Sequence, residues 1–583
     1  MLTKAPSTPQ VHEDDFGYYV VKRSSPILVR FRYLKIQDGE HFFYQQLLLS
    51  LPSRNEDDLL AGCRSYREHF LKRNPDLESA LTLQRAEMNE QHQNTVSSQF
   101  QQVMTTLLHN IGLTSTSSKL TDIISVQLNA LRKLPPLLPQ LAVLQLPDDQ
   151  YYVFNTITNN LGPMNKKKYP FFFITGSAGT GKSYMVNMII DWLNKSKKRN
   201  YLLMAPTGIA SENIGGQTIH STLRLAHSAS GFQSLAFYDK DFQKFLSKIE
   251  TLIIDEVSMV SGPLLTYISN LFAQIHGNSI AFGGINVILV GDLAQLPPVR
   301  GLSVFYSSVW HLFYPLFLRK SKRQQEDNDF YDMLEQIRFG NITDEIWDKL
   351  TKKAAEYSSS QSLDNLLTTT HIVAHRESAN QINRTICNAL PVDNEKFLIS
   401  EAIDLIQDTQ VSPNQTQSEF KSKTNLPESG RLQPGARVMF LNNTLIKEGI
   451  CNGTIGVVTD LNNDDSTVEV AFSVRGAIIH KQIMQTTAYF YASGQRASRT
   501  QFPLLNSFGL TIHKTQSVTL PNVSAELAQL FAPGQAYVAL SRPKTWADVQ
   551  IVNLHRNSFI TDPEVIQEYL RLEEIAKQPL PII

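Results

Sequence analysis

Eight residues near position 180 have the types and spacing of a loop that binds nucleotide phosphates. They match the pattern G-x-x-x-x-G-K-[ST]. The glycines would let the backbone wrap phosphate oxygens because no Cβ stands in the way. Lys182 would reach the β- and γ-phosphates, and the Ser183 hydroxyl would hold Mg²⁺. The pattern predicts a nucleoside triphosphate site rather than a chance match on an ordinary strand-turn-helix. The loop residues are Gly176, Ser177, Ala178, Gly179, Thr180, Gly181, Lys182 and Ser183.

Two adjacent carboxylates follow this loop along the chain. The apolar run Leu252–Ile254 leads directly into Asp255 and Glu256. Asp255, at the tip of a strand, can hold Mg²⁺ through water, and Glu256 can act as general base on the attacking water. Acidic residues are common at strand ends for structural reasons, so the pair gains its meaning from the phosphate loop before it. Together the two features predict hydrolysis of the triphosphate.

Three further polar residues could contact the γ-phosphate. Gln295 follows the apolar run Val287–Val290, and its side chain could sense the γ-phosphate or form a hydrogen bond within its own loop. Arg323 and Arg542 could neutralise transition-state charge through two hydrogen bonds each; the pattern places Arg542 at the end of a strand. Alone, each arginine would be an ordinary surface residue. Two domains with the nucleotide between them would make both catalytic.

The elements that must position these groups alternate between strands and helices from about residue 140 onward. Phe171–Thr175 is typical of a buried strand, and Tyr184–Asn194 has the pattern of a helix. Such alternation predicts parallel sheets covered by helices, here as two α/β domains in series. Sites in these sheets lie at the carboxyl ends of the strands. The other runs expected to form strands are Leu202–Ala205, Leu252–Asp255, Val287–Val290, His371–Ala374, Arg437–Leu441, Ala536–Leu540 and Val549–Val552.

Shifts in composition divide the chain into five segments. Alternating short runs after residue 452 predict a small β-barrel inserted in the second α/β domain, and the polar stretch 406–430 predicts a long surface loop. A Gln-rich stretch over 78–110 indicates a solvated helix or linker. The segments are a partly helical N-terminal region of unknown role, the first α/β domain, the first part of the second domain, the barrel and the last part of the second domain: 1–135, 136–319, 320–452, 453–505 and 506–583.

The overall composition is that of an ordinary globular protein. Lys plus Arg and Asp plus Glu each number 54, so the net charge gives no sign of nucleic-acid binding and leaves room for a local basic groove. Cys63, Cys387 and Cys451 share no metal-binding spacing, which favours a reducing compartment. No apolar run approaches the ~20 residues that a membrane span needs. We therefore expect an intracellular protein without a membrane contact.

Seven ordered motifs resemble those of the petite-integration-frequency (Pif-type) DNA helicases of superfamily one B. The resemblance extends roughly over residues 140–570. It implies two RecA-like parallel-sheet domains with a small inserted Src-homology-3-like β-barrel. It also implies ATP-dependent 5′-to-3′ movement on single-stranded DNA, with unwinding of duplex or structured DNA in replication, recombination or repair. The motifs are Ala205–Ser211, Gly215–Ser221, Asp255–Met259, Phe282–Gly284, Gly291–Pro298, Thr511–Gln516 and Tyr537–Arg542.

The same resemblance implies roles for individual residues. Gln150 matches the glutamine that reads adenine, and Arg323 and Arg542 match the two arginine fingers. Arg338 matches a structural position in the helix after the first finger. The segment near 224–248 lies where the family places its strand-separating wedge. The remaining matches are the ATP and Mg²⁺ set and the motifs that line the DNA track: Lys182, Ser183, Asp255, Glu256 and Gln295, then Thr207, His220, Ser221, Thr511 and His513.

Two features depart from a plain helicase core. Ser517 stands where the family usually has Gly, and a positive φ there would strain a serine by about 1 kcal/mol or more, which would affect coupling between DNA and ATP. Arg32-Tyr33, Phe42–Leu49 and Ser53–Glu56 resemble the segment that precedes the helicase in Helitron-type transposon proteins. The chain would then be a helicase part alone or a domesticated descendant.

The implied partners are single-stranded and forked DNA, with G-quadruplex DNA and RNA–DNA hybrids as further candidates. We expect ATP as substrate, Mg²⁺ as cofactor and a monomer during translocation. In a eukaryote the expected compartment is the nucleus, with the mitochondrion as the alternative. Two other functions remain open at this point. One is a nucleic-acid-stimulated ATPase that moves on RNA or remodels protein complexes without separating strands, and the other is a scaffold with a vestigial ATPase.

Overall fold

The computed structural model describes residues 11–13 and 19–21, parts of 43–73, and 117–581 with internal gaps, of which the longest are 134–145, 412–419 and 162–168. These residues belong to two compact units, 1–95 and 96–583. The Gln-rich stretch, Ser53–Glu56 and Ser517 lie outside the described residues.

The first unit contains a small hairpin and a short helical cluster. Strands β1 (Val11–Glu13) and β2 (Tyr19–Val21) pair antiparallel. Helix α3 (Tyr66–Arg73) follows the buried residues Phe43, Leu47 and Leu59 in the sequence. The ring of Phe43 lies 5.6 Å from that of Phe70 between ring centroids. Leu47 is buried as well, so part of the apolar run near residue 45 supplies a local core.

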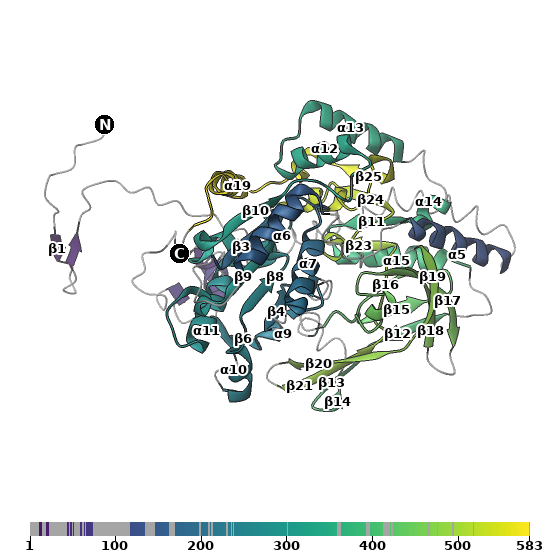
Figure 1. Cartoon of the computed structure of the whole chain (residues 1–583). Coiled ribbons are helices and arrows are strands. Elements are labelled where there is room, and N and C mark those ends of the chain that lie inside the picture. The colour runs from purple at the N-terminus through teal and green to yellow at the C-terminus, as the bar shows by residue number, and fades with distance from the viewer. Residues whose placement is uncertain are drawn as a thin grey trace. The chain divides into compact units, whose positions relative to one another are not determined.

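The second unit begins its α/β architecture with a six-stranded parallel sheet (Figure 1). The strands predicted around the phosphate loop are all present. Their residues are almost entirely apolar because helices cover both faces of a parallel sheet. In spatial order the strands are β10 (Tyr314–Leu318), β3 (Phe171–Gly176), β9 (Asn286–Gly291), β8 (Thr251–Ile254), β4 (Tyr201–Ala205) and β5 (Gln217–Thr218).

Helices and one hairpin accompany this sheet. Helix α7 covers the predicted helix Tyr184–Asn194 and begins two residues earlier, at Lys182. The region expected to hold a wedge contains a hairpin followed by a helix. The elements are α6 (Asp148–Asn160), α7 (Lys182–Lys195), α9 (Ile219–Thr222), β6 (Leu225–Ser228), β7 (Gly231–Ser234), α10 (Lys240–Leu246) and α11 (Gly262–Ile275).

A second parallel sheet has the order β23-β11-β24-β25. It confirms the strands expected near His371 and Val549 and adds two more. The strands are β23 (Gly509–Thr511), β11 (Thr369–Val373), β24 (Asn522–Leu527) and β25 (Val549–Leu554). The helices of this part are α12 (Asn328–Arg338), α13 (Asp344–Glu356), α14 (Leu363–Thr368), α15 (Arg376–Ala389) and α17 (Ile512–Thr515).

One strand predicted for this domain is wrong, and another forms but belongs to a different sheet. The run Ala536–Leu540 is helical and forms α18 (Gln535–Leu540), which starts after Gly534 at a φ of 75°. All six residues of α18 are buried, and a short apolar run without periodicity does not distinguish a buried helix from a strand. Arg437–Leu441 does form a strand, β16 (Arg437–Phe440), but it pairs antiparallel in a different sheet.

The predicted barrel region forms strands throughout, but they divide between two antiparallel sheets. One sheet has the order β19-β18-β17-β16-β22 and the other β14-β13-β21-β20. Strands from outside 453–505 join both sheets. An alternating pattern predicts that a segment is a strand but does not specify which strand it pairs with. The strands are β13 (Ile403–Ile406), β14 (Thr409–Gln410), β17 (Ile455–Asn462), β18 (Thr467–Val474), β19 (Ala477–Ile483), β20 (Thr486–Ala492), β21 (Gln495–Gln501) and β22 (Leu504–Asn506). A further pair joins β12 (Leu398–Glu401) to β15 (Ser429–Leu432). The stretch 406–430, expected to be a loop, therefore contains β14 near its start and the first residues of β15 at its end.

Two helices pack away from their predicted segments. Helix α5 (Ser117–Arg132), assigned to the N-terminal region, belongs to the second compact unit, where Gln127 donates to the Gly435 carbonyl at 2.9 Å. Helix α19 (Pro563–Ala576), assigned to the second α/β domain, buries apolar side chains in the core of the first. Its position is set by tertiary burial, which the local pattern of an amphipathic helix does not specify. None of the described helices is long and apolar enough to cross a membrane.

Candidate nucleotide site and nucleic-acid track

The phosphate loop joins the end of β3 to the start of α7, so its backbone lies at a helix N-terminus (Figure 1). Gly179 and Gly181 have φ angles of 84° and 91°, which only glycine adopts readily. A Cβ on Gly176 would lie 2.4 Å from the Leu318 carbonyl oxygen of the neighbouring strand. The glycines are therefore needed for both turn geometry and close packing, and the helix start is suited to an anion.

Lys182 lies inside this loop. Its Nζ donates to the carbonyls of Gly176 at 2.8 Å and Ser177 at 2.9 Å. Burial lowers the pKa of Lys182, and the charges of Asp292 and Glu256 oppose that change. The ammonium thus sits in a buried site lined by carboxylates and loop carbonyls.

Gln150 contacts the loop from helix α6. Its Nε2 donates to the Thr180 carbonyl at 2.9 Å, and its side chain is buried. A Cβ on Gly181 would come within 2.7 Å of the same Nε2. The structure therefore brings the predicted adenine-reading residue against the phosphate loop.

Ser183, Asp255 and Glu256 meet beside the loop. The Ser183 hydroxyl donates to Asp255 Oδ2 at 3.4 Å, and the Glu256 backbone N–H donates to Asp255 Oδ1 at 2.8 Å. Both carboxylates are buried, and Glu256 has a φ of 49°. Burial, and next the neighbouring charge of Glu256, raise the pKa of Asp255. A hydroxyl and a carboxylate are oxygen donors of the kind that Mg²⁺ prefers, so this pair fits the predicted metal.

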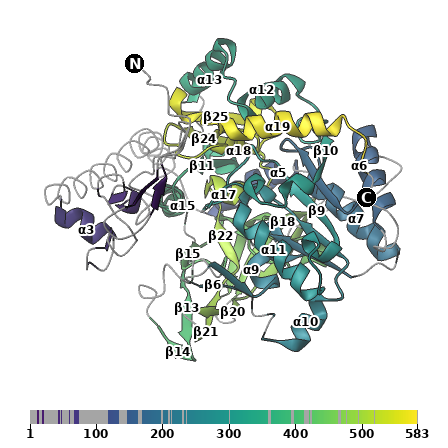
Figure 2. The ribbon, with the colours of Figure 1, turned by 90° about the vertical axis from the view of Figure 1, so that its left-hand side faces the viewer.

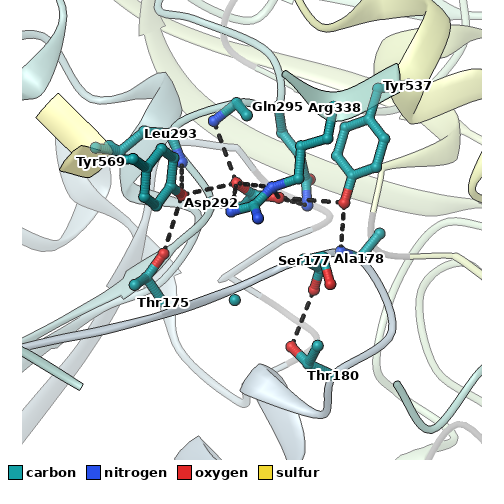
Figure 3. A network of polar contacts seen from close by, with 12 residues as sticks. Thr175, Ser177, Ala178, Thr180, Asp292, Leu293, Gln295, Arg338, Tyr537 and Tyr569 are labelled. Atoms are coloured by element: carbon teal, nitrogen blue, oxygen red, sulfur yellow. Dashed lines mark hydrogen bonds and ion pairs between the residues drawn. The ribbon is translucent and has the colours of Figure 1, made fainter. Parts of the chain in front are cut away.

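Gln295 lies in a turn built on a buried carboxylate (Figure 3). Its Nε2 donates to Asp292 Oδ2 at 3.4 Å. The Arg338 guanidinium binds the same carboxylate, with NH2 2.8 Å from Oδ1. Burial alone would raise the pKa of Asp292, but Arg338 and Lys182 outweigh it and hold the pKa below its usual value. Asp292 therefore stays ionised and holds Gln295 near the loop.

The two predicted arginine fingers, Arg323 and Arg542, both bind residues of the second α/β domain. Arg323 donates from NH1 to the Ser541 carbonyl at 2.8 Å and from Nε to Thr519 Oγ1 at 3.1 Å. Arg542 donates to the Val538 carbonyl at 2.7 Å. Burial lowers the pKa of both arginines. The positive charge of Arg542 lowers the pKa of Arg323 further.

The linker that carries Arg323 also contacts the tip of the phosphate loop. The Lys322 backbone N–H donates to the Gly179 carbonyl at 2.7 Å. A Cβ on Gly179 would lie 2.6 Å from the Arg323 Cβ. Arg323 is therefore brought to the loop, whereas the Arg542 side chain is held by carbonyls of its own domain.

Gln516 is a further site residue, to which the motif Thr511–Gln516 alone assigns no role. Its Nε2 donates to Glu256 Oε2 at 2.9 Å and lies 3.5 Å from Gln295 Oε1. Its Oε1 is buried without a hydrogen-bond partner. The signal was available, because Gln516 ends the motif Thr511–Gln516, but only the fold shows that it reaches the carboxylate of the first domain.

The residues predicted to line the DNA track lie at strand ends of both parallel sheets. Thr207 follows β4, and its hydroxyl accepts the Ala210 N–H at 3.2 Å. His220 is on α9 after β5, with its ring 6.4 Å from that of Phe232. Ser221 is exposed on the same short helix. These positions share one edge of the first sheet, as the resemblance implies for a surface that nucleic acid follows.

The second sheet contributes Thr511 and His513 at the end of β23 and the start of α17. Burial, and next the charge of Arg376, lower the pKa of His513. His375, beside Arg376, stacks on Phe531 with ring centroids 5.3 Å apart, and Phe531 is 55% exposed. Exposed aromatic rings and cations are typical of surfaces that bind single-stranded nucleic acid, and Arg376 follows His375 in the sequence. The sequence reasoning missed this pair because one member follows β11 and the other β24.

Comparisons with known proteins agree with this arrangement. The family model of PIF1-like helicases matches residues 145–347. A protein of Bdellovibrio bacteriovorus named ATP-dependent DNA helicase Pif1 is 30% identical over 410 residues, which are 69% of this chain and 88% of the relative. The human protein named ATP-dependent DNA helicase PIF1 is also 30% identical over 410 residues, again 69% of this chain but only 61% of the relative. The chain thus spans less than two thirds of its human relative.

Solved structures resemble the chain over a similar extent. The crystal structure of Pif1 helicase from Candida albicans has a TM-score of 0.63 and 28% identity, and the match covers 73% of this chain and 99% of that one. Bacteroides Pif1 bound to single-stranded DNA has a TM-score of 0.56 and 25% identity, with 75% and 98% covered.

Proposed function

The chain belongs to the PIF1-like family of ATP-dependent DNA helicases, and from its site we propose that it couples ATP hydrolysis to 5′-to-3′ movement along single-stranded DNA. The observation that carries the proposal is the hydrogen bond from Gln516 to Glu256 at 2.9 Å. It joins the second domain to the carboxylate that would activate water in the first. Movement of one domain relative to the other would therefore change the geometry of the general base.

In this proposal the loop residues bind the triphosphate. Lys182 would exchange its contacts with the carbonyls of Gly176 and Ser177 for the β- and γ-phosphate oxygens. Gln150 would read the adenine edge from its position against Thr180. Gln295, held by Asp292, would report whether a γ-phosphate is present.

Glu256 would accept a proton from the attacking water. Ser183 and Asp255 would hold Mg²⁺, which supplies charge neutralisation on the phosphate oxygens when bound. Their oxygens lie 3.4 Å apart and both are oriented beside the loop.

Arg323 and Arg542 would stabilise the charge that develops on the transferred phosphoryl group. Arg542 is buried and Arg323 is half-buried, and partial removal from water strengthens their interaction with an anion. Both now bind backbone carbonyls. Exchange of those carbonyls for phosphate oxygens on domain closure would complete the site. Closure would then alternate the grip of the two domains on DNA.

The segment Thr511–Gln516 would transmit that alternation. Thr511 ends β23 at the proposed DNA track, and Gln516, five residues later, contacts Glu256. Thr207, His220, Ser221, Thr511 and His513 would contact the strand, largely through its phosphates, so that sequence matters little. Arg376 and the exposed ring of Phe531 would add an ionic contact and a stacking surface.

The substrate that we propose is forked DNA with a single-stranded 5′ tail, with β6, β7 and α10 acting as the wedge between strands. G-quadruplex DNA and RNA–DNA hybrids are further substrates to test. The proposed working form is a monomer inside the cell, in the nucleus of a eukaryote or alternatively in its mitochondrion.

The experiment that tests coupling measures ATP hydrolysis with no nucleic acid, with oligothymidylate and with oligouridylate. We expect oligothymidylate to stimulate hydrolysis most, and Glu256→Gln to abolish the stimulated rate. Glu250→Gln is the matched control, because Glu250 is exposed at the opposite end of the same strand. Stronger stimulation by the RNA, or full activity of Glu256→Gln, would contradict the proposal.

A further inference from the structure

The C-terminal helix α19 returns from the second α/β domain to the first. It follows β25 closely in the sequence, yet Val565, Tyr569 and Leu572 pack in the core of the first domain. In Figure 2 the helix lies beside β10 of the six-stranded sheet. The Trp310 indole donates to Glu568 at 2.6 Å, and Arg319 pairs with Glu573 at 2.7 Å. The docking of α19 is therefore specific along its length.

One side chain of this helix reaches the catalytic edge of the sheet. The Tyr569 hydroxyl donates to Asp292 Oδ1 at 2.8 Å and accepts the Leu293 backbone N–H at 3.0 Å. The Thr175 hydroxyl, one residue before the phosphate loop, lies 3.0 Å from it. Figure 3 shows the ring of Tyr569 pointing at Asp292 from the side opposite Tyr537. A single phenol thus binds the ends of β3 and β9 together.

The ring is fixed as firmly as its hydroxyl. The guanidinium of Arg338 lies 4.7 Å from the centroid of the Tyr569 ring, and Phe339 packs edge-on at 5.6 Å. Only 5% of the side chain is exposed. Burial and the adjacent Asp292 raise the pKa of Tyr569, so the phenol stays protonated and able to donate.

The Asp292 carboxylate accepts hydrogen bonds from several side chains besides Tyr569. Arg338 holds it with three contacts between 2.8 and 3.2 Å, and Tyr537 of α18 donates to Oδ2 at 3.3 Å. Gln295 approaches the same Oδ2. Tyr569 binds both Asp292 Oδ1 and the Leu293 N–H, so it contacts the first two residues of the turn that leads to Gln295.

We propose that Tyr569 is a positioning residue for ATP hydrolysis, which sets Gln295 through Asp292 and makes turnover depend on the docked C-terminal helix. The inference rests on the proposed function, since it assigns Gln295 to the γ-phosphate. The Tyr569 hydroxyl contacts Asp292, Leu293 and Thr175, none of which is assigned to the nucleotide. Its effect should fall on the rate of turnover more than on the binding of nucleotide or DNA.

The test is Tyr569→Phe in the full chain, which removes one oxygen and keeps the packed ring. Tyr314→Phe is the matched control. The Tyr314 hydroxyl donates to the Gln578 carbonyl at 2.8 Å, so this substitution also removes one hydrogen bond close to the end of the same helix. With oligothymidylate present, we expect Tyr569→Phe to lower kcat about five- to tenfold, the range of one lost hydrogen bond. The KM for ATP and the affinity for ADP should change less than twofold, and Tyr314→Phe should retain kcat.

A double-mutant cycle separates positioning from general stability. If Tyr569 acts through Gln295, the Tyr569→Phe change should add little to Gln295→Ala. Additive losses, an unchanged kcat in Tyr569→Phe, equal losses in both tyrosine variants, or a Tyr569→Phe protein that melts below the assay temperature would each overturn the inference. Wild-type protein without DNA-stimulated ATPase would instead overturn the proposed function.

Discussion

Gln516 is where the second domain meets the proposed general base. Its amide donates to Glu256 and lies near Gln295, and its own oxygen has no partner although it is buried. An unpaired buried acceptor costs about 1–3 kcal/mol. That cost is consistent with a contact kept for geometry rather than for stability.

We expect Gln516→Ala to reduce DNA-stimulated kcat about tenfold, because one hydrogen bond that holds Glu256 is lost. The ATPase rate without DNA should change less, since the coupling segment would then be idle. Steady-state hydrolysis with and without oligothymidylate measures both. Gln550→Ala, which breaks a 2.8 Å bond to Asn365 far along the second sheet, serves as control. Equal effects of the two variants would contradict the coupling role.

Gln150 supports a second residue-scale prediction. Gln150→Ala should raise the KM for ATP about tenfold with little change in kcat, because the lost contact binds ground state and transition state alike. It should also remove any preference for ATP over GTP. Hydrolysis of the two nucleotides by wild type and variant would check this. A variant that still prefers ATP as strongly as wild type would show that adenine is read elsewhere.

At the scale of elements, the antiparallel sheet β14-β13-β21-β20 depends on a buried ion pair. Arg499 binds both oxygens of Asp404, at 2.7 and 2.6 Å, and both side chains are fully buried. We expect Asp404→Ala to destabilise this part by about 3–5 kcal/mol, because it leaves a buried charge unpaired. Urea denaturation would measure the loss. Glu345→Ala, which breaks an exposed pair with Lys349, should cost far less, because water screens exposed charges. Similar costs would contradict the burial argument.

Some helices and strands could be predicted from the sequence and others could not. The phosphate loop, β3, β8 and α7 were predictable because local rules fix them: an apolar run, glycines at positive φ and a helix start. Helix α18 was not, since a fully buried run has no periodicity. The contact of Tyr569 with Asp292 joins residues 277 positions apart, and no local pattern encodes such a pairing. Family motifs supplied the site residues, whereas the structure supplied their partners.

At the scale of the whole second unit, the chain crosses between the α/β domains more than once. The linker with Arg323 lies against Gly179 of the loop, and α19 crosses back. Two crossings would restrain movement of the domains relative to each other. Closure would then be a guided motion that carries the arginines to the nucleotide.

If closure brings Arg323 to the nucleotide, substitutions of two arginines in the same linker should differ in their effect on kcat. Arg323→Lys should lower kcat about a hundredfold or more, because lysine keeps the charge and loses the bidentate fork. Arg319→Lys should have little effect, since Arg319 makes an exposed pair with Glu573. ADP affinity should be unchanged in both. Full activity of Arg323→Lys would remove it from the transition state.

The most direct test of the account is ATP-dependent unwinding of duplexes that carry either a single 5′ tail or a single 3′ tail, with Glu256→Gln beside the wild type. We predict unwinding from the 5′ tail only, and none by the variant. Unwinding from the 3′ tail, or none from either tail while single strands still stimulate ATP hydrolysis, would contradict 5′-to-3′ strand separation as the function of this chain.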